Sequence, residues 1–124
     1  MAVETTTSFD PEAFRRGYEQ WDIDALLALY ADEVELIQLD RDNPPSAPRV
    51  RHGKEMFKGM FEHCARAGVT ATVENAVAGE HRVAATVTCE FPGGRKVLAN
   101  SILEIQDGRI VRERDVLSGD RKRS

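Results

Sequence analysis

The segment 111–117, VRERDVL, carries the residues whose types and spacing best suit proton-transfer chemistry. Read as a strand, it places Glu113 and Asp115 on one face and Arg112 and Arg114 on the other, because successive strand residues point to opposite faces. A strand with one buried and one solvated face normally carries its charges on one side only. Charge on both faces therefore indicates either an edge strand in water or a strand with one face lining a pocket that needs a carboxylate.

The turn before this segment predicts the neighbours of its acids. The dipeptide Asp-Gly at 107–108 is a strong hairpin signal. Counting back from it places Asn100 opposite Asp115 and Ile102 opposite Glu113, among apolar side chains. A carboxylate in such surroundings should have a raised pKa and could exchange protons near neutral pH. The simpler alternative is a surface carboxylate paired with a neighbouring arginine.

Four further polar or aromatic residues are candidates for the same pocket. Gln38 shares a strand face with Leu36. Trp21 and Tyr30 could face a cavity, although core packing is the simpler interpretation of both. His63 could point inward from a helix, although a solvated histidine is the simpler interpretation there. We take Asp115 as the candidate catalytic residue and the others as candidate pocket residues: Asn100, Gln38, Glu113, Tyr30, His63, Trp21, Phe14 and Phe61.

No pattern in the sequence predicts a metal or a cofactor. The histidines, cysteines and carboxylates are scattered without metal-ligand spacing. Neither a glycine-rich phosphate loop nor a GxSxG motif is present. His63 and Cys64 are adjacent on a predicted helix and would not face each other, so a Cys/His dyad is not expected.

Length and composition predict one ordinary globular domain. The chain has 124 residues, of which 41% are hydrophobic and 31% charged, and its net charge is −4. This balance does not favour nucleic-acid binding, and no apolar run approaches the length of a membrane span. Two cysteines without CxxC spacing favour a reducing cytoplasm. The polar start, MAVETTTSFD, does not resemble a signal peptide.

Helical signals dominate the first half of the chain. Asp10 can cap a helix that has Pro11 at its first position and a stripe of Phe14, Tyr18 and Trp21. A second helix is expected from residue 22, with its apolar stripe at positions 23, 26, 27 and 30. A third is expected over 54–67, with a stripe that includes Phe57, Met60, Phe61 and Cys64.

Strand signals dominate the second half, which predicts an α+β fold. A short strand is expected at 34–40, and a loop at 41–53, where three prolines argue against regular structure. A four-stranded antiparallel meander is expected from residue 69 onward. We predict a single domain over 9–118, between a disordered tail at 1–8 and a basic tail at 119–124.

Three stretches together resemble the nuclear transport factor 2-like (cystatin-like) superfamily, within it the SnoaL-like polyketide cyclases and ketosteroid isomerases. They are WDIDALLALYADEVEL at 21–36, RHGKEMFKGMF at 51–61 and ILEIQDGRIVRERDVL at 102–117. The resemblance implies a curved mixed or antiparallel sheet wrapped as a cone around three N-terminal helices, with an apolar pocket inside. It also implies a homodimer through the outer sheet face.

The resemblance carries the functional residues over unevenly. Asp115 matches the acid/base aspartate that SnoaL-like cyclases place on the last strand. Gln38 and Phe14 stand where ketosteroid isomerases have their base and their oxyanion tyrosine, and the isomerases' protonated aspartate falls near Asn100 or Ser101. The isomerase trio is therefore absent. Limonene-epoxide hydrolases need an arginine and two aspartates, and no convincing second aspartate is present. Scytalone dehydratase-like sites use paired histidines, and His63 has no clear mate.

Two hypotheses follow from the sequence. The first is a cofactor-independent enzyme of cyclase, isomerase, dehydratase or epoxide-hydrolase type that acts on a hydrophobic small molecule, with Asp115 as general acid/base. The second is a non-catalytic ligand-binding or dimerisation module of the same fold. Both predict a hydrophobic ligand and a homodimer, without nucleic-acid or membrane partners.

Overall fold

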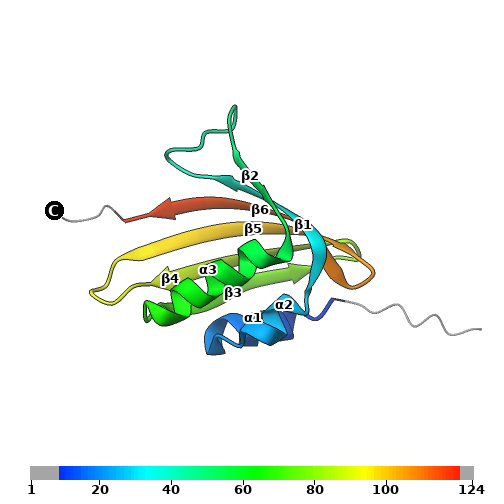
Figure 1. Cartoon of the computed structure of the whole chain (residues 1–124), viewed down its shortest axis with the longest axis horizontal. Coiled ribbons are helices and arrows are strands. Elements are labelled where there is room, and N and C mark those ends of the chain that lie inside the picture. The colour runs from blue at the N-terminus through cyan, green and yellow to red at the C-terminus, as the bar shows by residue number, and fades with distance from the viewer. Residues whose placement is uncertain (1–8, 121–124) are drawn as a thin grey trace, which may run out of the picture.

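A computed structural model describes residues 9–120, in which three helices lie against one face of a six-stranded mixed sheet (Figure 1). The helices are α1 (Pro11–Gln20), α2 (Ile23–Leu27) and α3 (Lys54–Arg66). The strands are β1 (Tyr30–Leu39), β2 (Arg49–His52), β3 (Thr70–Ala78), β4 (Arg82–Glu90), β5 (Lys96–Gln106) and β6 (Arg109–Gly119). The tail predicted at 1–8, and residues 121–124 of the basic tail, lie outside the described residues.

The strands are ordered β2-β1-β6-β5-β4-β3 across the sheet. β3 to β6 form the expected antiparallel meander, and β1 joins it by pairing parallel to β6. The helices occupy one face of this curved sheet, whereas β2 and its connecting loop stand apart from them (Figure 1). The predicted α+β cone with a mixed sheet is therefore confirmed.

The local signals at the start of α1 act as predicted. The carboxylate of Asp10 accepts hydrogen bonds from the backbone N–H groups of Glu12 and Ala13, which would otherwise lack partners. The ring of Phe9 packs against that of Phe14, with 6.0 Å between centroids. The first helix is thereby fixed at its N-terminus, and its apolar stripe is directed at the sheet.

Two element boundaries differ from the sequence-based expectation. α2 ends at Leu27, and Tyr30 opens β1 rather than extending the helical stripe. A strand, β2, occupies the end of the proline-containing segment that was expected to be loop. It pairs antiparallel with β1 beyond the last proline, Pro48, where backbone donors are again present. Both differences lengthen the β1 side of the sheet.

The core lies between the helices and the inner face of the sheet. Its large side chains come from the three helices, β1, β4 and the β5–β6 hairpin, and nine of them are essentially inaccessible to solvent: Tyr30, Phe14, Phe57, Leu26, Leu36, Leu103, Ile110, Val34 and Val83. Aromatic rings meet across the helix–sheet boundary, as where Tyr30 packs on Phe57 with 4.3 Å between centroids. These contacts fix the position of α3 over the strands.

The register of the last hairpin contains a bulge that the sequence-based count did not include. Both turn residues, Asp107 and Gly108, have positive φ, as a tight Asp-Gly hairpin requires. The first pairs after the turn are as expected, up to Ile105 opposite Ile110. The next pair is Glu104 with Arg112, so Val111 is an extra residue on β6. Every later residue of β6 is consequently displaced by one relative to β5.

Gly17 is the point of closest approach between α1 and α2. A Cβ built on it would lie 2.7 Å from Cγ of the fully buried Leu26. We expect Gly17→Ala to lower the free energy of unfolding by about 1–3 kcal/mol, because overpacking outweighs the better helix propensity of alanine. Gly59→Ala in α3 is the matched control, since a Cβ there meets nothing within 4 Å. Urea denaturation of both variants tests this, and equal stability of the two would contradict it.

Candidate functional site

Two acidic side chains of β6 lie next to each other inside the protein. Glu113 and Asp115 alternate with the exposed residues Arg112 and Arg114, and their side chains are only 2% and 5% exposed. Two carboxyl groups buried this deeply are uncommon unless they are paired. The mixed charge of β6 is thus divided between an inner acidic face and an outer basic face.

Three hydroxyl-bearing residues surround this acid pair. The phenol of Tyr30 donates a 2.6 Å hydrogen bond to Oε1 of Glu113. Ser101 lies directly opposite Asp115 on β5, and its hydroxyl lowers the pKa of that carboxyl. Tyr18 is also buried, and the charges of Glu113 and Asp115 help to raise the pKa of its hydroxyl. The acids therefore occupy a polar cluster enclosed by an apolar core.

The environment raises the pKa of both acids. Burial is the main cause for Glu113, whose pKa lies well above the ordinary value, and the nearby Asp115 raises it further. Burial also raises the pKa of Asp115, whereas hydrogen bonds from Glu113 and Ser101 partly offset that rise. Burial and the neighbouring carboxylate therefore favour the protonated form most strongly at Glu113, whose pKa is raised further above its ordinary value than that of Asp115. The two groups form one acid–carboxylate pair.

One oxygen of this pair lacks a hydrogen-bond partner within residues 9–120. Asp115 Oδ1 is buried and has no hydrogen-bond partner among the described residues. Buried polar atoms normally have a partner, so an unpartnered carboxylate oxygen indicates a place where a ligand or water binds. Asp115 is the last buried inward-facing residue of β6, and Leu117 beyond it is half-buried.

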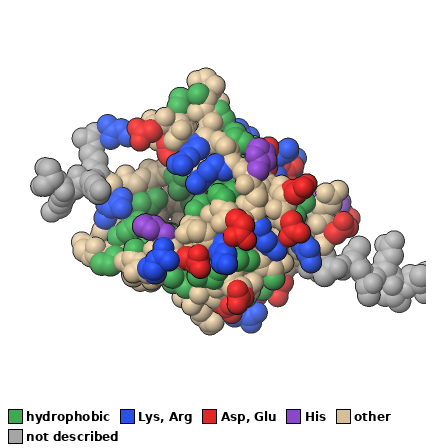
Figure 2. Space-filling model, in the orientation of Figure 1, with side chains coloured by type: hydrophobic (Ala, Val, Ile, Leu, Met, Phe, Trp, Pro, Cys, Tyr) green, Lys and Arg blue, Asp and Glu red, His purple; other side chains and the backbone are tan. Residues whose placement is uncertain are grey.

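That change follows the length of the hairpin. Toward the turn the inward-facing residues, such as Leu103 and Ile110, are fully buried. Beyond Asp115, the inward-facing residues are only half-buried: Cys89, Val97, Ala99 and Leu117. Figure 2 shows a hollow lined by hydrophobic side chains between α3 and strands β5 and β6. An apolar molecule entering there would meet Asp115 at the inner end.

A second polar group adjoins the pair from the β1 side. Gln38 lies opposite Asp115 in the parallel pairing of β1 with β6 and is 9% exposed. Its Oε1 accepts a 2.9 Å hydrogen bond from Nη2 of Arg51 on β2. Nε of Arg51 is buried without a hydrogen-bond partner among residues 9–120. Gln38 therefore lies between two groups that are unpartnered within the described residues. One is the acceptor Oδ1 of Asp115, and the other is the donor Nε of Arg51.

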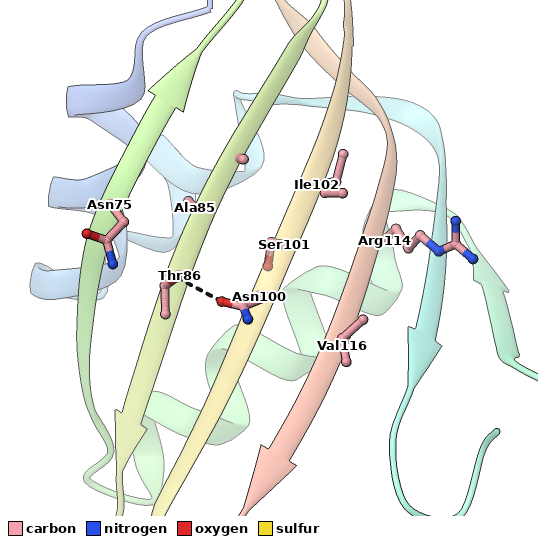
Figure 3. A pocket seen from close by; sticks show the side chains of 9 residues that line it. Asn75, Ala85, Thr86, Asn100, Ser101, Ile102, Arg114 and Val116 are labelled. Atoms are coloured by element: carbon pink, nitrogen blue, oxygen red, sulfur yellow. Dashed lines mark hydrogen bonds between the residues drawn. The ribbon is translucent and has the colours of Figure 1, made fainter. Parts of the chain in front are cut away.

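The structure does not place Asn100 beside Asp115. Because of the bulge at Val111, Asn100 lies opposite Val116 and faces outward, where it accepts a 2.8 Å hydrogen bond from Thr86. Figure 3 shows both residues on the sheet face away from the helices, in a shallow hollow. The sequence-based register was wrong here, and Ser101 is the neighbour of the acid.

The remaining predicted pocket residues lie at varied distances from the acids. Phe14 and Phe61 are core residues, exposed by 1% and 2%. The indole N–H of Trp21 donates to the backbone carbonyl of Val69 at 2.7 Å, so its polar atom is turned away from the pair. His63 is exposed on α3. The structure brings together Asp115, Glu113, Tyr30 and Gln38 from the predicted set.

Three residues of the cluster were not predicted from the sequence. Ser101 would have followed from a register that includes the bulge. Arg51 lies on β2, a strand of four residues that directly follows a segment with three prolines. That strand is too short for an alternating pattern to predict which way Arg51 points. Tyr18 was seen only as part of the apolar stripe of α1, because a strand partner for its hydroxyl cannot be deduced from helical spacing.

The described residues contain no cluster of side chains suited to binding a metal ion. Within 9–120, no three His, Cys, Asp or Glu side chains are grouped closely enough to hold a metal ion. None of the helices in that range is long and apolar enough to cross a membrane. The cluster itself can take up and release a proton, and it can orient a small molecule by hydrogen bonds.

Comparison with known proteins identifies relatives of this architecture. The SnoaL-like domain family matches residues 12–113. No curated protein sequence matches the chain significantly. Among solved structures, a protein from Kribbella flavida DSM 17836, provisionally assigned as a ketosteroid isomerase, is similar with a TM-score of 0.70 and 15% identity. The likeness covers 92% of this chain and 78% of that one.

Two further solved structures share the fold. One is an epoxide hydrolase from M. tuberculosis of the LEH-like type, with a TM-score of 0.64, 17% identity, and coverage of 87% of this chain and 79% of that one. The other is a computationally designed 17-OHP binder, with a TM-score of 0.61, 21% identity, and coverage of 89% and 95%. At these identities the likeness establishes the fold and leaves the chemistry to the site.

Proposed function

Because the chain belongs to the SnoaL-like domain family, we propose that it is a cofactor-independent enzyme that moves protons on a hydrophobic small molecule. The observation that carries this proposal is the unpartnered, buried oxygen of Asp115 beside the buried carboxyl group of Glu113. A solvent-exposed carboxylate would be too weak a base for a carbon acid, whereas burial raises its pKa toward the working pH.

In the proposed mechanism Asp115 is the general base. Its Oδ1 takes a proton from a carbon next to a carbonyl group, and the electron pair of that C–H bond forms the enolate. The same carboxyl group then returns the proton to another carbon or to an oxygen. Glu113 donates its hydrogen bond to Asp115 throughout and is itself held by Tyr30. Cyclase, isomerase and dehydratase reactions can all share this step.

The proposal can be tested without knowing the natural substrate. Hydrophobic ketones such as 1-tetralone and 2-tetralone carry exchangeable hydrogens next to the carbonyl. In D₂O the protein should accelerate the exchange of these hydrogens for deuterium, measured by NMR, above the rate in buffer. The enzymatic proposal would be contradicted if a series of hydrophobic ketones bound to the protein and none of them exchanged its hydrogens faster than in buffer.

That negative result would favour a ligand-binding module instead. The likeness to a computationally designed 17-OHP binder supports this alternative, because that protein shares the fold and was designed to bind a ligand. In a binding module the unpartnered oxygen of Asp115 would accept a hydrogen bond from a ligand hydroxyl or amine. The ligand would then shift NMR signals of residues around Asp115 and undergo no exchange.

We also propose that a second copy of the chain covers the outer sheet face. Four large apolar side chains are exposed there: Val77, Leu98, Ile102 and Val116. Ile102 and Val116 line the hollow that contains Asn100 (Figure 3). Contiguous exposed apolar surface of this kind favours a protein–protein contact. The inner face keeps its pocket, because the helices and not the partner cover it.

Introducing a charge on this face should separate the two copies. Val116 is 52% exposed, so Val116→Lys leaves the core intact while placing an ammonium group in the proposed contact. We expect light scattering to show the mass of a dimer for the wild type and of a monomer for the variant. Ala28→Lys, an exposed position at the end of α2, is the control and should remain dimeric. A monomeric wild type would overturn this proposal.

A further inference from the structure

Arg51 is held in the site by contacts that leave its strongest hydrogen-bonding capacity unused. It lies on β2 opposite Leu36, and its Nη2 donates to Oε1 of Gln38 at 2.9 Å. The same nitrogen contacts Sδ of Met60 on α3 at 3.5 Å. Its Nε, as described above, is buried without a partner. A guanidinium group has five N–H donors, and these contacts use only one of its nitrogens.

The charge of Arg51 also lacks a nearby counter-ion. Within residues 9–120, no carboxylate lies within 4.0 Å of its guanidinium group. Arg112 and Arg15 each contact two glutamates, so other arginines of this protein are compensated. Burial and the neighbouring Arg49 lower the pKa of Arg51, yet a guanidinium stays protonated. An anion bound here would offset an unfavourable, partly desolvated charge.

The unsatisfied donor and the unsatisfied acceptor flank one residue. Gln38 hydrogen bonds to Arg51 on one side and lies opposite Asp115 on the other. The neighbouring side chains are apolar: Met60 contacts the guanidinium, and Leu117 is the next inward-facing residue of β6 after Asp115. Basic side chains also lie along the β2 side of the hollow in Figure 2. The site therefore complements an apolar molecule with one anionic oxygen and one acidic hydrogen.

We propose that Arg51 anchors an anionic oxygen, a carboxylate or a stabilised enolate, of the hydrophobic substrate whose proton is taken by Asp115. This inference deepens the proposed function and rests on it. Nε of Arg51, which has no partner among the described residues, donates a charge-assisted hydrogen bond to the anion. Gln38 keeps the guanidinium in place, so it is a positioning residue. The substrate class is thus an acidic, mostly apolar carbonyl compound.

Binding of two matched probes tests this proposal. 2-Naphthoate carries a carboxylate on a naphthalene ring, and 2-ethylnaphthalene has a similar shape without oxygen. Calorimetry should show the wild type binding 2-naphthoate more tightly than 2-ethylnaphthalene. Arg51→Met should weaken 2-naphthoate binding about 10- to 100-fold, the effect of losing hydrogen bonds to a charged group, and leave 2-ethylnaphthalene binding unchanged.

Two further variants separate anchoring from general electrostatic attraction and from loss of structure. Arg49→Met removes an exposed positive charge from the same strand and should change the affinity for 2-naphthoate little. Arg51→Lys keeps the charge without the planar fork and should retain part of the affinity. Equal losses in Arg51→Met and Arg49→Met would overturn the proposal. A wild type that binds the two probes equally would also overturn it.

The binding test is independent of catalysis. Asp115→Asn should bind 2-naphthoate at least as tightly as the wild type, because it removes a neighbouring negative charge. Arg51-dependent binding in a protein that never accelerates deuterium exchange would reject the enzymatic proposal and keep the anchor. Deuterium exchange that depends on Asp115, together with 2-naphthoate binding that is unaffected by Arg51→Met, would keep the enzymatic proposal and reject the anchor.

Discussion

Asp115→Asn should lower the rate of proton exchange on a bound ketone by about 10²- to 10⁴-fold, the range expected for removing a general base. An amide has nearly the shape of a carboxylate but cannot accept the proton. Its carbonyl oxygen can still accept hydrogen bonds from Glu113 and Ser101, so the local structure should persist. The rate is measured by NMR in D₂O, and the affinity for the ketone is measured separately on the same protein.

The control for this variant lies in the same hairpin. Asp107→Asn makes the identical chemical change at an exposed turn residue with φ of 53°, a conformation that asparagine adopts readily. It should exchange the ketone at the wild-type rate. An Asp115→Asn protein that folds, binds the ketone and keeps the wild-type rate would remove Asp115 from the mechanism.

Glu113→Gln should make the protein more stable at alkaline pH and less sensitive to pH. The folded protein holds the Glu113 proton with a pKa well above the ordinary value, whereas the unfolded chain releases it near pH 4.3. Between those two pKa values the folded state binds more protons, so the free energy of unfolding falls as the pH rises. The loss approaches about 1.4 kcal/mol per pH unit for each proton involved.

Glutamine is a neutral side chain of the same shape and does not titrate. Its carbonyl can accept the hydrogen bond from Tyr30, and its amide N–H can donate to Asp115, as protonated Glu113 does. Near pH 8 we expect the variant to be about 1–3 kcal/mol more stable than the wild type, and near pH 4 the difference should vanish. Asp115 still titrates in the variant, so some pH dependence remains.

Urea denaturation at several pH values measures this effect. The control is Glu74→Gln, an exposed position on β3, which should follow the wild-type curve. The groups that face the acid pair are the hydroxyls of Tyr18, Tyr30 and Ser101, with Gln38 on the β1 side. Arg51, the cation of the cluster, donates to Gln38, and among residues 9–120 no cation lies within 4.0 Å of Glu113 to stabilise its ionised form. A wild type whose stability rises between pH 5 and 8 would contradict the assignment of the proton to Glu113.

Local signals were sufficient to predict the class of the fold. Asp10 and Pro11 mark the start of α1, Gly68 follows the end of α3, and Asp-Gly at 107–108 marks the last turn. Each of these signals depends on backbone chemistry within a few residues. Position 30 fails because its spacing continues the helical stripe, while its ring is in fact buried against Phe57 from a strand. Tertiary packing outweighed helical periodicity at that residue.

The site was only half predictable for a different reason. Asp115 and Glu113 follow from alternation within one strand, which is a local property. Ser101 depends on the register between two strands, and Arg51 depends on which way an edge strand is turned. Alternation within a strand gives a face but not the residue across from it. The bulge therefore left Glu113 and Asp115 together on one face of β6, as alternation predicts, and changed the residue opposite Asp115 from Asn100 to Ser101.

Val111 also bears on how such a site can arise and be lost. The strand that follows it carries acids at odd positions, Glu113 and Asp115, and Arg114 and Val116 at even ones. One set or the other must face the interior, and the extra residue decides which. Deleting a single residue there would exchange a buried acid pair for a buried arginine without changing any side chain after it. In this hairpin the number of residues in β6 determines which side chains face the interior. A one-residue insertion or deletion would therefore change the whole inward-facing set, whereas a substitution changes one member of it.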